Sequence, residues 1–340
     1  MRPRALVRSI VDASELGEDG VLALISDVLT SAPTTIVGPG DDCAVLEVTG
    51  PVVATTDVLV EGEHFVQDWS SPYDIGERAA AQNLADVAAM GAHPSALVVG
   101  MALPGHAAGE WVRECARGLA DRARAIGAGI EGGDLTRSRG GIVISVTALG
   151  DLRGRTPVLR SGARVGDAIV IAGTLGMSRT GFELYDAGRM TPTGLAEEAT
   201  SEKPVRELAE ACAAVFRAPN PPLHTAIGAA ARLHAMMDVS DGLARDCQRI
   251  ARASGVSMCL DSTLLAPDCQ RVAPLDELCR STAWSRVLRG GEDHAFVATC
   301  APDAIPTGFR IIGSVESASG IDVSVDSQPL TGPLGWESLA

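Results

Sequence analysis

The sequence predicts an α/β protein, an α+β sandwich of two domains with helices on one face of a sheet. Its 340 residues are enough for two domains with cores of their own. Apolar segments before residue 150 follow the order strand, strand, helix, strand, helix, strand, and a similar order restarts after "RSGARVGD". We therefore expect one domain over residues 1–152 and a second over residues 153–340, with the boundary near residues 150–155.

The first half alternates amphipathic helices with β-branched strands. Its first helix is expected to place Leu22, Leu24, Ile25 and Val28 on its inner face. The expected elements in chain order are a helix over residues 13–32, a turn and strand over 36–48, a strand over 51–65, an Ala-rich helix over 71–92, a strand over 95–104, a helix over 109–128 and a strand over 141–152.

The second half repeats this alternation after a turn. The expected elements are a turn and strand over residues 160–176, a helix from 178 to 188, a surface connection over 191–205, two helices about a short strand over 222–256, and strands within 257–267, 292–300 and 309–315. We find neither a sequence repeat nor a low-complexity tract.

The composition excludes several classes of function. A formal charge of −15 disfavours a protein that binds nucleic acid or anionic membranes through its charge. No apolar run reaches membrane length and no charged-then-apolar leader is present, so we expect a soluble, cytoplasmic protein. The eight cysteines never occur as C-x-x-C and lie in apolar segments, which predicts small buried thiols in a reducing compartment.

The chain contains a single lysine, Lys203, in "TSEKPVRE". A P-loop needs Gly-Lys-Ser/Thr, and the protein-kinase pattern needs a lysine on a strand beside the nucleotide. Neither pattern is present. A protein of this sequence that handles phosphates must therefore use arginine, backbone amides and metal ions.

Aspartates recur where the expected elements join. Asp57 closes an apolar strand, Asp86 lies in the Ala-rich helix three residues after Asn83, and Asp134 follows two glycines. Each aspartate alone is more often a turn or cap residue, and we interpret Asp41 in that way. Together, these carboxylates lie in apolar segments, and the chain has only one lysine that could pair with them. They therefore indicate sites for oxygen-ligated cations, of which Mg²⁺ fits best.

Three further patterns have an ordinary interpretation, and two of them also suggest a phosphate contact. "EGGDLTR" combines a carboxylate with glycines, which allow the backbone to approach a ligand closely, as in a phosphate-binding site. The same pattern is also a common turn. Arg160 could bind a phosphate with its forked guanidinium, or simply be a solvated arginine. Ser240 and Asp241 could be the N-cap and first turn of the following helix.

A series of segments resembles the thiamine-monophosphate kinase family. They are "GDDCAVL", "TTDVLVEGEHF", "QNLADVAAMGA", "EGGDLTR", "LRSGARVGD", "DVSDGLARD", "LRGGEDHAF" and a late "GW", in this order from about residue 38 to 336. The resemblance implies the fold of the aminoimidazole-ribonucleotide synthetase superfamily. It also implies that the N-terminal domain dimerises through its sheet and that the C-terminal domain covers the nucleotide.

The resemblance also assigns roles to individual residues. It implies a Mg²⁺-binding set of Asp42, Thr55, Thr56, Asp57, Asp86, Asp134, Asp238 and Asp241. It places Gly133, Asp134, Arg160 and Ser240 against ATP, and His64, Glu292 and Trp336 against thiamine phosphate. Without it, His64 would be a strand-end histidine, Glu292 a turn residue and Trp336 a packing anchor. The chain departs from the family at Leu135, where a threonine is usual, and in its tail "GWESLA".

The implied reaction is ATP + thiamine phosphate → ADP + thiamine diphosphate, by direct in-line transfer assisted by several Mg²⁺ ions. The attacking phosphate oxygen has a second pKa of about 6, so no catalytic side chain is needed as a base. The alternatives are a selenophosphate synthetase, a hydrogenase-maturation dehydratase and a non-catalytic metal-binding protein. The two enzymes use a reactive cysteine near the N-terminus or at the extreme C-terminus, whereas the first cysteine here is Cys43 at an expected strand start and none follows residue 300. A non-catalytic protein would not need "LRGGEDHAF".

Overall fold

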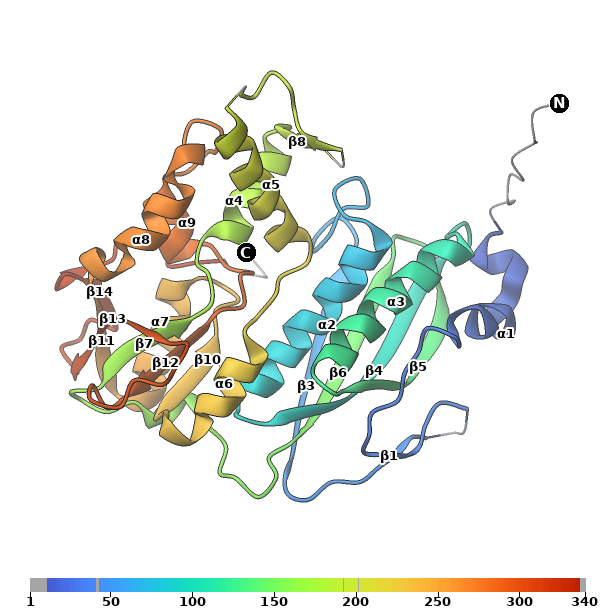
Figure 1. Cartoon of the computed structure of the whole chain (residues 1–340), viewed down its shortest axis with the longest axis horizontal. Helices are drawn as coiled ribbons and strands as arrows, with labels where there is room; N and C mark the ends of the chain where they lie inside the picture. The colour runs from blue at the N-terminus through green and yellow to red at the C-terminus, as the bar shows by residue number, and fades with distance from the viewer. Residues whose placement is uncertain (1–10, 41–42, 192, 201, 337–340) are drawn as a thin grey trace.

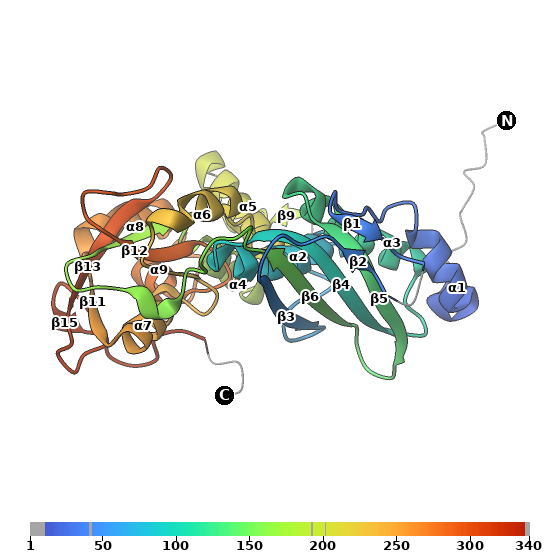
Figure 2. The same ribbon diagram turned by 90° about the horizontal axis from the view of Figure 1, so that it is seen from below.

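The computed structural model describes residues 11–40, 43–191, 193–200 and 202–336. Within them the chain forms a four-stranded and a seven-stranded sheet, with two short two-stranded ladders (Figure 1). The molecule is elongated, with the four-stranded sheet towards one end and the seven-stranded sheet towards the other (Figure 2). The predicted α/β class, with helices on one face of a sheet, is confirmed.

The first half supplies the four-stranded sheet and its helices. Its elements are α1 (Ala13–Ile25), β1 (Thr35–Val37), β2 (Val45–Leu46), β3 (Val52–Val60), α2 (Pro72–Ala89), β4 (His93–Pro104), α3 (Gly109–Ala125), β5 (Gly129–Ser138) and β6 (Val143–Asp151). The order in the sheet is β3-β6-β4-β5, and the neighbours are antiparallel except β4 and β5.

The second half supplies the seven-stranded sheet. Its elements are η1 (Arg160–Gly162), β7 (Ala168–Ala172), α4 (Met177–Asp186), β8 (Met190–Thr191), β9 (Gly194–Leu195), α5 (Lys203–Arg217), α6 (Leu223–Ala229), η2 (Ala230–Arg232), β10 (Ala235–Asp238), α7 (Leu243–Ser254), β11 (Val256–Leu260), α8 (Ser262–Val272), η3 (Ala273–Leu275), α9 (Ala283–Arg289), β12 (Phe296–Cys300), β13 (Arg310–Ser317), β14 (Val323–Val325) and β15 (Gln328–Pro329). The strand order is β10-β12-β7-β13-β11-β14-β15.

The four-stranded sheet has one covered face and one open face. Side chains alternate between the faces of a strand, so Leu59 and Val146 are buried under the helices while Val58 and Val98 are exposed. The helices α2 and α3 lie on the covered face, and no other element of the described chain covers the opposite face (Figures 1 and 2).

The helix α2 begins at a capping box and packs closely on α3. The Ser71 hydroxyl accepts the Asp74 N–H, and the Asp74 carboxylate accepts the Ser71 N–H. A Cβ atom on Gly76 would lie 2.0 Å from the carbonyl oxygen of Cys115 on α3, so only glycine allows this approach. Gly118 on α3 has an equally close contact with the start of α2.

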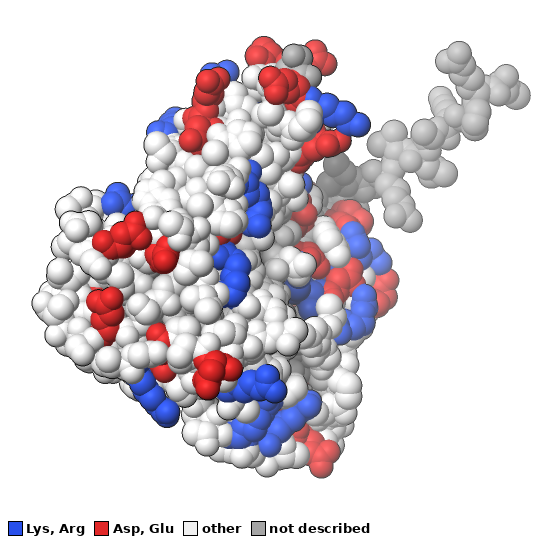
Figure 3. All heavy atoms as spheres, turned by 60° about the vertical axis from the view of Figure 1, so that its left-hand side comes forward, with Lys and Arg blue, Asp and Glu red and all other residues white. Residues whose placement is uncertain are grey.

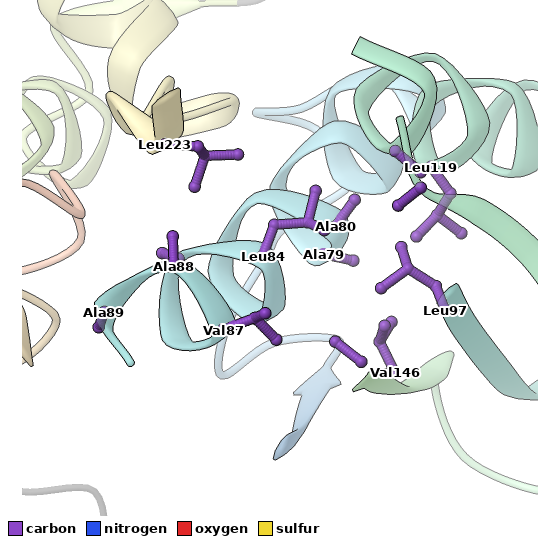
Figure 4. Close-up of a cluster of buried hydrophobic side chains, with 14 of the residues drawn as sticks. Ala79, Ala80, Leu84, Val87, Ala88, Ala89, Leu97, Leu119, Val146 and Leu223 are labelled. Carbon is purple, nitrogen blue, oxygen red and sulfur yellow. The ribbon is translucent and has the colours of Figure 1, made fainter. Parts of the chain in front are cut away.

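The two halves share one hydrophobic core around α2. Figure 4 shows Val87 of α2 near Val146 of the four-stranded sheet, and Leu223 of α6 near the other side of the same helix. Val170 and other residues on one face of the seven-stranded sheet join this core, whereas Ile171 faces a second core with α4, α5 and α7. The domain boundary that we predict near residues 150–155 falls between β6 and β7, and a division into independent units stays a prediction.

Three expectations about local structure were wrong. Leu22 is 45% exposed, whereas Val21 and Ile25 are buried, because residues four apart share a helical face. Residues 203–217 form α5, whose start we expected to be part of a surface connection over residues 191–205. Residues 262–272 form α8, where we expected the continuation of a strand; the Asp261 carboxylate accepts the N–H groups of Thr263 and Leu264 and starts the helix.

The cysteines are reduced, but they are not uniformly buried. Cys115, Cys212, Cys247 and Cys300 are buried, as expected. Cys43 is exposed, and Cys259, Cys269 and Cys279 are half-buried, so the expectation of eight buried thiols was wrong for these four. The apolar character of a segment does not decide which of its side chains turns inward.

The surface carries both signs of charge. On the face shown in Figure 3, acidic and basic side chains are interspersed over a largely uncharged surface. The helices of the described residues include none that combines the length and the apolar character needed to cross a membrane. Our expectation that nucleic acid and membranes are not partners stays a prediction.

Candidate active site

The candidate site begins at the contact between α2 and β3. The Thr55 hydroxyl on β3 donates a hydrogen bond of 2.7 Å to Oδ2 of Asp86 on α2. One turn earlier on the same face, the Asn83 side chain accepts the Asp57 N–H at 3.1 Å and donates to the carbonyl oxygen of Ala79 at 2.9 Å. Asn83 and Asp86 therefore hold the middle of β3, and Asp57 lies inside this strand rather than closing it as expected.

Three aspartates from both halves of the chain approach one another at this contact. They are Asp57 on β3, Asp86 on α2 and Asp238 at the end of β10. Burial, with a contribution from the charge of Asp238, raises the pKa of Asp86 to about 7. Burial likewise raises the pKa of Asp57. Among the described residues, no ion pair with arginine or lysine includes these three carboxylates, so they repel one another.

The segment Glu292–His294 brings three side chains to this region. The Glu292 carboxylate lies 2.5 Å from a guanidinium nitrogen of Arg78 on α2, and Nδ1 of His294 lies 2.9 Å from Oδ2 of Asp238. Between them, the Asp293 carboxylate accepts backbone N–H groups at the start of α4. Glu292 and His294 have φ angles of 66° and 50°, in the left-handed region, which lets alternate side chains point in different directions.

Burial and neighbouring charges shift the pKa values of Glu292 and His294. Although removal from water works to raise the pKa of Glu292, the Arg78 and His294 charges lower it below the usual value. Burial works to lower the pKa of His294, but its hydrogen bond to Asp238 raises the pKa to about 9. His64 also lies near enough to lower the pKa of Glu292 and of Asp57, and its Nδ1 accepts the Val60 N–H at 3.1 Å. His64 and Glu292 therefore occupy the same region as the aspartates.

Several other predicted site residues lie apart from this region within one chain. Thr56 is on the opposite, open face of the sheet, where its hydroxyl donates to the carbonyl oxygen of Val146. Gly133 and Asp134 lie on β5, the far edge strand from β3, at roughly 14 Å for three strand spacings. Arg160 is exposed in η1, beside the start of β10 rather than its end. Asp42 lies outside the described residues.

The segment after Asp238 joins the tail of the chain. The Ser240 carbonyl oxygen accepts the Glu292 N–H at 3.0 Å, which places Ser240 beside the site. The Asp241 carboxylate pairs with Arg249 at 2.5 Å, and its carbonyl oxygen accepts the Trp336 N–H at 2.9 Å. The Trp336 side chain is 58% exposed, so it is not a packing anchor in this single chain.

An open cavity of about 560 Å³ lies beside this tail. It is lined by Arg245, Gln248, Leu330, Gly332, Pro333, Leu334 and Gly335. A Cβ atom on Gly335 would lie 2.1 Å from the carbonyl oxygen of Asp241, so glycine is required for the tail to pass so close. Leu135, where the resemblance leads us to expect a threonine, packs partly buried against the core that the two halves share.

The residues fit magnesium better than a transition metal. Within the described ranges, no three His, Cys, Asp or Glu side chains are grouped so as to hold a metal ion by themselves. Mg²⁺ needs only one or two protein carboxylates, because water and phosphate complete its octahedral shell. Asp57, Asp86 and Asp238, with the Thr55 hydroxyl, offer oxygen ligands whose repulsion a cation would relieve.

Sequence reasoning missed three residues of this site. Arg78, Gln82 and His294 contact the predicted site residues, since Arg78 and Gln82 both donate to Oε2 of Glu292. Signals were present for two of them: Arg78 is a cation in an Ala-rich helix, and His294 lies inside the segment "GGEDHAF". Neither signal indicates its partner, because the contacts span 214 and 56 residues of sequence.

Comparison with known proteins gives consistent matches over nearly the whole chain. A family model described as AIR synthase related protein, N-terminal domain, matches residues 40–152. The thiamine-monophosphate kinase of Mycobacterium tuberculosis is 41% identical over 327 residues, which cover 96% of this chain and 92% of that protein. The thiamine-monophosphate kinase of Corynebacterium glutamicum is 38% identical and covers 97% of both chains.

Solved structures agree with these relatives. The thiamine-monophosphate kinase of Stenotrophomonas maltophilia has a TM-score of 0.75 at 30% identity, over 92% of this chain and 96% of that one. A structure described as AaThiL complexed with AMPPCP and TMP has a TM-score of 0.72 at 29% identity, over 95% and 97%. These likenesses and the family model confirm the predicted aminoimidazole-ribonucleotide synthetase-like fold. The chain belongs to the thiamine-monophosphate kinase family.

Proposed function

We propose that this protein transfers the γ-phosphoryl group of ATP to thiamine monophosphate, giving ADP and thiamine diphosphate. The observation that carries the proposal is the meeting of Asp57, Asp86 and Asp238 beside Glu292 and His64. Full-length similarity to thiamine-monophosphate kinases supports it, as does the likeness to a structure complexed with AMPPCP and TMP.

Asp57, Asp86 and Asp238, with the Thr55 hydroxyl, would hold Mg²⁺, and several ions are expected. When bound, Mg²⁺ would neutralise the negative charge of the phosphate groups. Asp42, Thr56, Asp134 and Asp241 complete the proposed set. Thr56 would have to contribute its carbonyl oxygen, because its hydroxyl lies on the other face of the sheet. Asp241 would have to give up its ion pair with Arg249 in order to bind a cation.

The two substrates would bind on either side of this set. Gly133, Asp134, Arg160 and Ser240 are proposed to contact ATP, and His64, Glu292 and Trp336 to contact thiamine phosphate. Glu292 suits a cationic substrate, because Arg78 keeps its pKa low and it therefore remains ionised. The exposed indole of Trp336 suits a thiazolium ring by cation–π attraction.

The chemistry is proposed to be direct in-line transfer. A phosphate monoester has a second pKa of about 6, so the attacking oxygen is already ionised at neutral pH and no side chain needs to remove a proton. The residues would then act by orienting the two phosphates and by excluding water. Thiamine itself should react negligibly, and labelled ATP should leave no phosphorylated side chain.

A second copy of the chain is proposed to complete the site. The face of the four-stranded sheet opposite α2 and α3 exposes Val52, Val58 and Val98, at 49%, 46% and 38%. A two-fold axis parallel to the strands would place the β5 edge of one copy over the β3 edge of the other. That arrangement would bring Gly133 and Asp134 of one subunit towards the β3 edge of its partner, from which a single sheet keeps them apart.

The cytoplasm is the proposed location. All eight cysteines are free thiols, which suits a reducing compartment.

An ADP-release assay tests the proposed reaction. Purified protein with ATP and Mg²⁺ receives thiamine phosphate, thiamine, selenide or no acceptor, and the products are separated by chromatography. We expect ADP and thiamine diphosphate in equal amounts with thiamine phosphate alone. ADP release with selenide but not with thiamine phosphate would overturn the assignment, and so would release that is independent of any acceptor.

A further inference from the structure

His294 forms a buried pair with Asp238. Nδ1 of the imidazole lies 2.9 Å from Oδ2 of the carboxylate, and the two residues are 2% and 3% exposed. A carboxylate of this kind can only accept, so Nδ1 carries the proton and donates it. The backbone fixes the pair as well, because the His294 N–H donates to the Val239 carbonyl oxygen and the Val239 N–H donates to that of Ala295.

Part of each side chain remains available for a ligand. The other ring nitrogen, Nε2, is buried and has no hydrogen-bond partner within the described part of the chain. No hydrogen bond among the described residues ends on the other carboxylate oxygen, Oδ1 of Asp238. A buried, unpartnered ring nitrogen costs free energy unless water or a ligand supplies a partner.

The surroundings favour a cation as the ligand of the free carboxylate oxygen of Asp238. The charge of His294 influences the pKa values of Asp57 and Asp86, and the charge of Glu292 influences the pKa of His294. The ring therefore lies among the acidic side chains of the candidate site. Carboxylate ligands of a metal are commonly oriented by a second residue that holds one of their oxygens, and loss of such a residue weakens metal binding about 10- to 100-fold.

We propose that His294 is a positioning residue for a divalent cation, because its Nδ1–H holds Oδ2 of Asp238 and leaves Oδ1 directed at the cation. This inference rests on the proposed function only in taking Asp238 as a cation ligand. It does not require that the chain phosphorylates thiamine phosphate. The role belongs to Nδ1, which distinguishes His294 from a residue that merely fills space.

Three substitutions of His294 distinguish the contribution of Nδ1 from that of Nε2 and from that of the ring as a whole. In His294→Asn the amide nitrogen reaches about as far as Nδ1, and in His294→Gln it reaches about as far as Nε2. His294→Phe keeps a ring with no donor. Asparagine also suits the backbone, because the φ of 50° lies in the left-handed region, where asparagine is enriched.

The chain offers a matched control at the other end of the same strand. His234 precedes β10, and its Nδ1 lies 2.9 Å from both carboxylate oxygens of Asp167, so it forms a second His–Asp pair, in which the histidine is half-buried. None of the predicted site residues hydrogen-bonds to Asp167. His234→Phe should therefore alter folding stability without altering cation affinity.

The measurement is a Mn²⁺ titration of the full chain in the absence of ATP and thiamine phosphate, in which electron paramagnetic resonance detects the free Mn²⁺. Melting curves check that each variant is folded. We expect His294→Phe and His294→Gln to weaken binding about 10- to 100-fold, and His294→Asn and His234→Phe to remain within about threefold of the parent. Parent-like binding by His294→Phe would overturn the proposal. If His294→Phe does not fold, the comparison of asparagine with glutamine decides.

Other outcomes are equally decisive. Rescue by glutamine and not by asparagine would assign the role to Nε2 and overturn the proposal, as would a parent protein that binds no Mn²⁺. An equal loss in His234→Phe would show a general stability effect and would also overturn it. Because no substrate is present, a failed ADP-release assay together with an Nδ1-dependent Mn²⁺ affinity would reject the proposed function and keep this inference.

Discussion

The Thr55 hydroxyl donates a hydrogen bond to Oδ2 of Asp86, with 2.7 Å between the two oxygens. The partner of this half-buried carboxylate is therefore a neutral hydroxyl and not a basic side chain. Burial and the charge of Asp238 work against ionisation, and they raise the pKa of Asp86 to about 7. A single hydrogen bond does not offset the repulsion between neighbouring carboxylates. We therefore expect Asp86 to destabilise the fold and to be present because it binds a cation.

Replacement of Asp86 by asparagine should abolish turnover and stabilise the protein without Mg²⁺. Asparagine can still accept the Thr55 hydrogen bond, but it carries no charge. The folded-state pKa is raised from 3.8 to about 7, so the cost of ionising Asp86 is absent near pH 4, grows with pH and is full above pH 7. The gain should therefore be largest at pH 8, at most about 4 kcal/mol. Denaturant melts at pH 4 and pH 8 measure it.

The outcome that contradicts this prediction is wild-type activity in the variant, which would end the interpretation of Asp86 as a metal ligand. Asp261→Asn is a suitable control, since Asp261 is a partly exposed cap at the start of α8. It should lower stability slightly and leave turnover unchanged.

Two inactive variants should complement each other if two subunits share the site. Asp86→Asn and Asp134→Asn each remove one carboxylate of the proposed site. Within one chain Asp86 lies on α2 against β3, whereas Asp134 lies on β5, the opposite edge strand of the sheet. Co-refolded mixtures would contain about half mixed dimers, each with one intact site, so we expect about a quarter of parental activity. Size-exclusion chromatography with light scattering checks the dimer. Activity that stays at the level of the single variants would indicate that each chain carries a whole site, or that Asp134 is not part of it.

Replacement of Trp336 by alanine should weaken thiamine phosphate binding selectively. An indole over a cationic ring contributes roughly 0.5–2 kcal/mol, or about two- to thirty-fold in affinity. We expect the KM for thiamine phosphate to rise by this factor and the KM for ATP to change little. Because the side chain is 58% exposed, the melting temperature should be unchanged. An early melt with normal thiamine phosphate binding would instead identify Trp336 as a packing residue.

Replacement of Glu183 by glutamine should destabilise the protein in a pH-dependent way. Burial works to raise the pKa of Glu183, but hydrogen bonds from Ser281 and Arg179 lower it below its usual value of 4.5. Its stabilising effect is therefore present above pH 4.5 and is lost as the pH falls through the folded-state pKa. We expect a loss of about 1–3 kcal/mol at pH 7 that shrinks below pH 4.5.

Glu207→Gln is the matched control for this measurement. Glu207 forms an exposed pair with Lys203 at 3.5 Å, and such pairs contribute little. A constant difference between Glu183→Gln and the parent from pH 7 to pH 3.5 would contradict the role assigned to the Glu183 charge.

Local sequence determined the elements around the site. The capping residues Ser71 and Asp74, the alanines of α2 and the β-branched run of β3 each specify their own structure over a few residues. The unusual aspartates were visible for the same reason, because Asp57 and Asp86 stand out against apolar neighbours. Amphipathic segments with ambiguous starts were less predictable, and α5 and α8 were missed.

Only the tertiary structure decided which of these residues meet. Asp238 reaches Asp86 because α2 packs against β10 as well as against its own sheet, and Arg78 reaches Glu292 across 214 residues for the same reason. Strand pairing likewise put Asp134 on the far edge from Asp57, and the pleat put Thr56 on the opposite face from Thr55. The sequence by itself determined the residue types and the local elements, since these depend on neighbours along the chain. Distances between residues far apart in sequence depend on how whole elements pack, and that is a property of the folded core.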